Sequence, residues 1–439
     1  MSPACTAVAM ACVFVLCAFD MAGSDFGLPD VVTTKRLGLL LLTAVYLLQR
    51  RSRLGVGSRY VLMNAAAVFF VAVWAFLSAA INDLAWGRMI LSFMTWAMIA
   101  YATVLFNSII PAVIREKRQL FLATVSVLAG ATVVATLLWL FKTAGLGVFL
   151  SRFALRTTID SLSCGNSRYM NGLFFVMVFP VAAVLGFIRV RPLIRGVSGT
   201  GVLLFVLLVL QEGSRQTAGA LVLFVLSNLV LTLFLGQPVV RSVKWRKRSR
   251  IIIRAMVALF LIGMPVAYVF ISREYQYELY RAFVERTQYH LETDRQGRLQ
   301  VAQDAFRTAC ANPLFGVGDF HEAGPKWNTL GKHTHNGYAN LMANYGLVPF
   351  VVLLVSIAWS LWRGFTLRRR AYENRDIWLV SYSFLVVHLV WSVNLNDILQ
   401  EYSLFYMLAL MFSALAAHPA LPPEEHGPLQ TQPRMGGSP

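Results

Sequence analysis

Long apolar runs alternate with short polar segments along most of the chain. A helix that crosses a bilayer needs about 20 mainly apolar residues, with a range of about 17–25. Runs of this kind predict twelve spans, at about 4–22, 32–49, 60–81, 88–107, 119–141, 169–188, 196–212, 217–236, 255–272, 337–362, 377–395 and 402–418. The pattern therefore predicts an all-α polytopic membrane protein.

Composition supports this class. The 439 residues are 57% hydrophobic and 14% charged, whereas soluble domains carry about 25% charged residues. The net charge of +18 would suggest nucleic acid in a soluble protein. Here the basic residues lie in short loops between apolar runs, which instead indicates membrane orientation.

The basic loops recur at every second hairpin. They are "RRSRLGVGSR", "PAVIREKR", "RVRPLIR", "RSVKWRKRSRIIIR" and "RGFTLRRRAYENR", and they hold 22 of the 39 Lys and Arg residues. Alternate loops such as "SDFGLPD" and "NDILQEY" are poor in them. The positive-inside rule then predicts that both termini are cytoplasmic. The N-terminal apolar run lacks a basic n-region, so we interpret it as a retained span rather than a cleaved signal peptide.

Two segments on the predicted outer side are too long for simple turns, at 142–168 and 273–336. The segment at 273–336 separates two groups of predicted spans: spans one to nine lie in 1–272, and spans ten to twelve lie in 337–418. The Pro- and Gly-rich tail at 419–439 predicts a disordered cytoplasmic end.

Two amphipathic helices are predicted within the large outer segment. Their sequences are "EYQYELYRAFVERTQYHL" and "RLQVAQDAFRTACANP". In the second, helical spacing predicts one apolar face and a stop at Asn312-Pro313. The members of that face are Leu299, Ala302, Phe306 and Ala309.

The five cysteines give little evidence for a metal site, because no C-x-x-C pair occurs. Cys5, Cys12 and Cys17 lie in or beside the first apolar run. Cys164 and Cys310 lie in the two outer segments, where disulfides persist. They either pair and tie the two segments together or remain free thiols.

The stretch "LQEGSRQTAGAL" interrupts an otherwise continuous apolar run with Glu212, Ser214 and Arg215. An arginine held at membrane depth is costly and usually marks a functional site. Alternatively, Arg215 pairs with Glu212 and only closes the hairpin.

A second pair of arginines, Arg295 and Arg298 in "TDRQGRLQ", leads into the second predicted outer helix. The planar guanidinium matches phosphate oxygens, and a helix N-terminus adds partial positive charge. The alternative is a solvated charge run.

The stretch "GKHTHNGYANLMANYG" places His333 and His335 directly before an apolar run. A zinc site is disfavoured, because catalytic zinc uses three protein ligands. The nearest further candidates, Asp319, His321 and Glu322, have no recognised spacing. A titrating base fits better, since the ordinary pKa of histidine is about 6.5.

His388 lies inside a predicted span, where we expect a satisfied buried histidine.

Four motifs follow one another in a set order along the chain. They are Ser214-Arg215, Gly297-Arg298, "NPLFGVGDF" and His335-Asn336 followed after nine residues by Gly346. This order resembles the O-antigen ligase family of bacterial lipopolysaccharide assembly. That family belongs to a wider group with O-antigen polymerases and bacterial O-oligosaccharyltransferases. Twelve spans with one large outer loop before the tenth resemble the ligases best.

The resemblance implies a GT-C-like membrane glycosyltransferase of the bacterial inner membrane, with a helical periplasmic loop between spans nine and ten. Its donor is a polysaccharide on undecaprenyl diphosphate, and its acceptor is a sugar of lipid A-core. It implies no metal, no other cofactor and no nucleic-acid partner.

The resemblance implies a role for each matching residue. His335 is the expected base, and Arg215 and Arg298 are expected to stabilise the charge of the diphosphate leaving group. Direct attack implies inversion at the anomeric carbon. Residues expected to bind substrate are Arg295, Asn336, His333, Ser214 and Asp397 of "NLNDILQEYS".

Two other functions remain open. A polymerase or O-oligosaccharyltransferase of the same group would use another acceptor. A transporter would also suit twelve spans, but transporters often show two similar halves with paired broken helices. The sequence shows no such halves.

Overall fold

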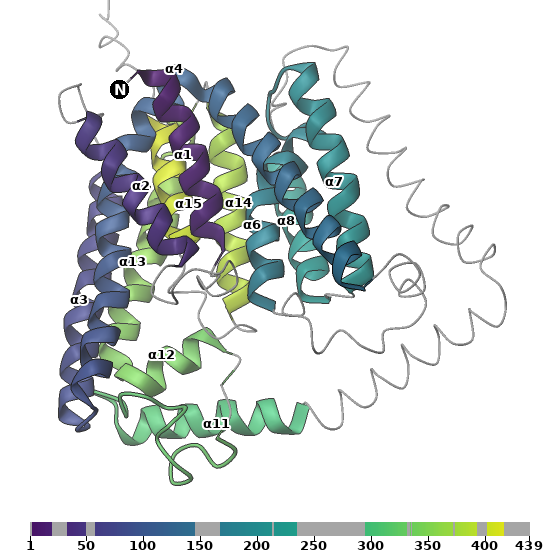
Figure 1. Cartoon of the computed structure of the whole chain (residues 1–439). Coiled ribbons are helices and arrows are strands. Elements are labelled where there is room, and N and C mark those ends of the chain that lie inside the picture. The colour runs from purple at the N-terminus through teal and green to yellow at the C-terminus, as the bar shows by residue number, and fades with distance from the viewer. Residues whose placement is uncertain are drawn as a thin grey trace, which may run out of the picture.

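The computed structural model describes residues 2–19, 33–49, 58–144, 167–212, 215–234, 295–331, 334, 336–371, 374–392 and 402–416. The regular elements in these ranges are helices, as predicted. They are α1 Pro3–Ala18, α2 Thr34–Gln49, α3 Arg59–Ile81, α4 Trp86–Ala144, α6 Ser167–Val184, α7 Pro192–Glu212, α8 Arg215–Phe234, α11 Arg295–Ala311, α12 Gly337–Tyr345, α13 Leu347–Thr366, the 3₁₀ helix η5 Arg368–Ala371, α14 Arg375–Trp391 and α15 Tyr402–Ala416. Figure 1 shows an upright bundle with α11 lying across one end.

Several of these helices suit a bilayer. Four described segments are long and apolar enough to cross one: Arg59–Ile81, Trp86–Leu138, Pro192–Val209 and Leu347–Thr366. Four shorter apolar helices are Pro3–Ala18, Gly172–Val184, Thr217–Thr232 and Tyr402–Ala416. The protein is an integral membrane protein.

The predicted span at 255–272 and the predicted outer helix at 274–291 lie outside the described residues, so the count of twelve and the domain bounds stay predictions.

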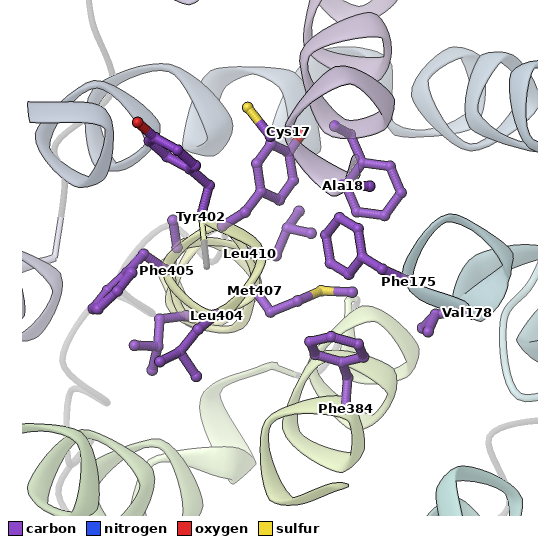
Figure 2. Packing of buried hydrophobic residues seen from close by; sticks show 14 of the residues in the cluster. Cys17, Ala18, Phe175, Val178, Phe384, Tyr402, Leu404, Phe405, Met407 and Leu410 are labelled. Atoms are coloured by element: carbon purple, nitrogen blue, oxygen red, sulfur yellow. The ribbon is translucent and has the colours of Figure 1, made fainter. Parts of the chain in front are cut away.

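Helix α15 forms the centre of the bundle. Every residue from Tyr402 to Leu415 is buried, as expected for a helix that is apolar on all sides. The Tyr406 hydroxyl donates to the carbonyl oxygen of Met10, 3.1 Å away. Figure 2 shows Met407 pointing between Phe175 of α6 and Phe384 of α14.

The sequence predicted a loop at "PAVIREKR", but most of this segment is helical. The chain stays helical through Pro111 and departs from helical geometry within α4 only at Lys117, with φ −137° and ψ 33°. Arg118 next to this kink pairs with buried Asp376 of α14 and donates to Asn374 Oδ1 at 3.1 Å. The kink therefore joins two helices directly, at the end of the bundle opposite α11 (Figure 1).

The predicted span 337–362 is also wrong as one helix. The chain breaks at Gly346 into α12 and α13. Gly346 has φ 90° and ψ −179°, a conformation essentially restricted to glycine. A Cβ at this position would overlap the carbonyl group of Leu314. Only α13 therefore has the length of a span, and α12 lies inclined between α11 and the bundle (Figure 1).

Helix α11 confirms that the second of the two predicted helices forms, but only part of its predicted apolar face, because Ala309 is buried and Phe306 is not. Phe306 is 59% exposed, whereas Val301 and Ala305 are buried. The reason is a polar contact: the Asp304 carboxylate accepts hydrogen bonds from Thr329 N at 3.1 Å and Oγ1 at 2.6 Å. This contact turns the Asp304 side inward and leaves Phe306 outside.

Candidate active site

The His-Asn-x9-Gly signature corresponds to one short helix. The nine residues between Asn336 and Gly346 are α12. Asn336 Oδ1 accepts hydrogen bonds from the backbone N–H groups of Tyr338 at 3.1 Å and Ala339 at 3.0 Å, which is an N-cap. Thr334 Oγ1 donates to the Asn336 carbonyl oxygen at 3.1 Å. The residues on either side of His335 are thereby tied to the start of α12.

The other end of α12 is held by the "NPLFGVGDF" stretch. Val317 N donates to the Ala343 carbonyl at 2.9 Å, and Gly318 N donates to that of Asn344 at 2.8 Å. Gly316, with φ 61°, passes so close that a Cβ would overlap the Ala343 oxygen. Gly316 lets two backbones touch, and Gly318, with φ 77°, packs against the Leu84 side chain, which explains the Gly-Val-Gly sequence.

The same stretch is anchored to the bundle through α3. Trp74 stacks on Phe315, with ring centroids 5.1 Å apart and planes 14° apart. Its Nε1 also donates to the Leu314 carbonyl at 2.9 Å. Because α3 belongs to the bundle, α12 cannot shift freely relative to the spans.

A charge contact fixes the outer segment to the first turn of α4. Arg88 lies 3.2 Å from Asp319 Oδ2 and also pairs with Glu322. The hydrogen bond from Arg88 lowers the pKa of Glu322. These two carboxylates were two of the three sequence candidates for completing a metal site, beside His321, and both form ion pairs with Arg88. Among the described residues, no group of three or more His, Cys, Asp or Glu side chains is placed to hold a metal.

The start of α12 also reaches α14. The Tyr338 hydroxyl donates to the Leu389 carbonyl oxygen at 2.7 Å. Two residues further along α14, Trp391 packs on α8 at Gly219, where a Cβ would lie 3.1 Å from Trp391 Cη2. Arg215 is the first residue of α8, one turn before Gly219. The end of α14 therefore links the start of α8 to the start of α12.

Helix α11 approaches α12 from the other side. Val301 and Ala305 pack in one buried cluster with Ala339 and Ala343. Arg298 lies three residues before Val301, in the first turn of α11. Described contacts thus link α12 directly to α11, and to α8 through the end of α14.

The structure describes some of the expected site residues and not others. Arg215, Arg295 and Arg298 lie in the first turns of α8 and α11, and their side chains lie outside the described residues. The same holds for the whole of four further candidates: His333, His335, Ser214 and Asp397. Asn336 is described, and its side-chain oxygen caps α12.

Two further predictions concern single side chains. His388 is buried as expected, at 8% exposed, and packs against Phe384 with ring centroids 5.3 Å apart. Cys310 is an exposed free thiol, and its proposed partner Cys164 lies outside the described residues.

Sequence reasoning missed the residues that join the helices. Asparagine before an apolar run is an N-cap signal, so the role of Asn336 in starting α12 was detectable. The Tyr338–Leu389 contact was not, because 51 positions separate the two residues. The Gly219–Trp391 approach likewise joins distant segments.

Comparison with known proteins adds the family. A family model described as O-antigen ligase matches residues 199–354. No curated protein matches the chain. The matched segment contains Arg215, Arg298 and His335, and its family indicates a glycosyltransferase-like activity of the ligase or polymerase type. Residues 199–354 therefore form a domain of the O-antigen ligase family, which confirms the resemblance found in the sequence.

Proposed function

We propose that the protein is an O-antigen ligase of the bacterial inner membrane. It transfers polysaccharide from undecaprenyl diphosphate to a sugar of lipid A-core on the periplasmic side, with both termini in the cytoplasm. One observation carries the proposal. Arg215, Arg298 and Asn336 stand at or near the starts of three helices inside the segment matched by the family, and contacts of α12 and α14 link these helices.

The arginines at these starts suit a diphosphate. As the glycosidic bond breaks, negative charge develops on the leaving group, and fixed cationic donors stabilise it. Arg215 and Arg298 supply planar donor forks. The N-termini of α8 and α11 add partial positive charge where backbone N–H groups lack helical partners. Ser214 and Arg295 are neighbours of these two arginines and complete the proposed donor site.

The acceptor needs a base, because a sugar hydroxyl is a weak nucleophile. His335 directly precedes the N-cap of α12, and we assign it the proton from the attacking hydroxyl. One direct displacement inverts the anomeric carbon. Asn336 Oδ1 is used by the cap, so its Nδ2 is the group left for substrate. His333 and Asp397 are assigned to the acceptor side.

A reconstituted transfer assay tests this function. The purified protein is placed in liposomes with an undecaprenyl-diphosphate-linked glycan, with and without lipid A-core. A ligase attaches the glycan to lipid A-core and releases undecaprenyl diphosphate. A longer lipid-linked glycan formed without lipid A-core would instead identify a polymerase. No product of either kind would contradict both assignments.

A further inference from the structure

A second polar site lies at the opposite end of the molecule from α11. A depression of about 760 Å³ opens beside the kink of α4, next to the first turns of α1 and α7 and the residue before α14. Its lining includes the basic side chains Arg115, Lys117, Arg118 and Arg191, and the acidic side chain Glu116. The active-site proposal uses none of these residues.

The basic side chains divide into two kinds. Arg118 is largely buried, pairs with Asp376 and donates to Asn374 Oδ1 at 3.1 Å. Arg115, Lys117 and Arg191 are exposed. In the described part of the chain, no acidic group forms an ion pair with any of these three. Their charge is available to an anion.

Part of the lining is apolar. Leu193, in the first turn of α7, is 80% exposed. Ile194 follows it, and Leu120 lines the facing side on α4. An exposed leucine at a helix start would add nothing to the binding of a soluble anion. It would contact a bound lipid, because the acyl chains lie along the helices while the headgroup stays among the basic side chains.

We propose that this depression binds the headgroup phosphate of an anionic phospholipid. Basic pockets between membrane helices on the cytoplasmic side recognise such headgroups. The placement in the inner leaflet rests on the orientation given in the proposed function. Binding itself needs neither that orientation nor transfer activity, so each proposal can fail alone.

Native mass spectrometry tests the site on the delipidated full-length protein. The probes are phosphatidylglycerol, phosphatidylcholine and inorganic phosphate, at equal concentrations. The test variant carries Arg115→Gln, Lys117→Gln and Arg191→Gln, and leaves Arg118 in its ion pair. The control carries Arg369→Gln and Arg370→Gln, which are exposed at the same end but do not line the depression. Thermal unfolding in phosphatidylcholine checks that both variants fold like the wild type.

One basic residue near an anionic lipid surface contributes about fivefold in affinity. We therefore expect the triple variant to lose phosphatidylglycerol binding by about tenfold or more, and the control to bind like the wild type. Unchanged binding by the triple variant would overturn the proposal. It would also be overturned if inorganic phosphate bound as tightly as phosphatidylglycerol, because the ligand would then be a soluble phosphate.

Discussion

At the scale of single residues, Asn336 and Gly346 decide where α12 begins and ends. Asn336 supplies the oxygen that satisfies two N–H groups of the first turn. Gly346 turns the chain with φ 90° against the carbonyl of Leu314. In this account the signature positions His335 through the helix that follows it.

Gly346→Ala should therefore damage the site without touching substrate. It adds a Cβ that overlaps Leu314 in a glycine-only conformation. The matched control is Gly324→Ala, at φ 78° with nothing within 4 Å of the new Cβ. Conformational strain costs the control about 1–2 kcal/mol, and the overlap should cost Gly346→Ala a further 1–3 kcal/mol or so. Thermal unfolding in detergent measures both; equal losses would contradict the close approach.

Asn336→Ser and Asn336→Ala separate capping from substrate binding. Serine caps helices as well as asparagine, whereas alanine loses about 1 kcal/mol. We expect Asn336→Ser to keep wild-type thermal stability but to lose transfer, because serine restores the cap and not the amide nitrogen assigned to the substrate, and Asn336→Ala to lose both. A stable and fully active Asn336→Ser variant would show instead that only the cap is needed.

At the scale of elements, the site depends on how closely α8 approaches α14. Gly219 allows this approach, since a Cβ there would lie 3.1 Å from Trp391. Trp391 lies close to Leu389, which accepts the hydrogen bond from Tyr338. A wedge between α8 and α14 would displace Arg215 relative to α12.

Gly219→Leu introduces that wedge. The control, Gly199→Leu in α7, has no atom within 4 Å of a new Cβ. We expect Gly219→Leu to lower the transfer rate at least about tenfold, because a displacement of about 1 Å in a catalytic arrangement can cost 10²-fold. Gly199→Leu should stay close to the wild type in the same liposome assay. Equal rates for the two variants would show that the α8–α14 contact does not position the site.

The sequence predicted most described spans, because a bilayer sets the length of an apolar run. It did not predict the kink at Lys117, because the polar residues around it suggested a loop. The helix instead continues through most of them, kinks at Lys117 and resumes at Arg118, whose partner Asp376 lies 258 positions away. The break at Gly346 was missed for a similar reason, since it depends on backbone contact with Leu314.

The sequence motifs of the proposed site could be recognised, whereas the contacts that join their helices could not. The order of the arginine and histidine motifs is visible in the sequence, and the family match covers these motifs. The proposed approach of their helices rests on the contacts of Tyr338, Gly219 and Trp391, which join segments far apart in the sequence. The predicted apolar face of α11 was wrong at Phe306, because the Asp304–Thr329 contact turns the Asp304 side inward, and right at Ala309, which is buried.

At the scale of the whole molecule, the proposed orientation puts α11 outside the inner membrane and η5 inside. Cys310 is exposed on α11, and Arg370 is exposed on η5. In variants whose other cysteines are replaced, an impermeant thiol reagent outside the inner membrane should label Cys310. It should label Arg370→Cys only after that membrane is opened. Labelling of Arg370→Cys from outside would contradict the orientation.

The central claim is that His335 acts as the base in transfer of a lipid-linked glycan to lipid A-core. The most direct measurement is the transfer rate of His335→Ala in the liposome assay, compared with His321→Ala. His321 is an exposed histidine of the same outer segment and has no place in the proposed site. Loss of a general base typically costs about 10²–10⁴-fold. We therefore predict a loss of that size for His335→Ala, with normal folding and membrane insertion, and a near wild-type rate for His321→Ala. Near wild-type transfer by His335→Ala would contradict the account.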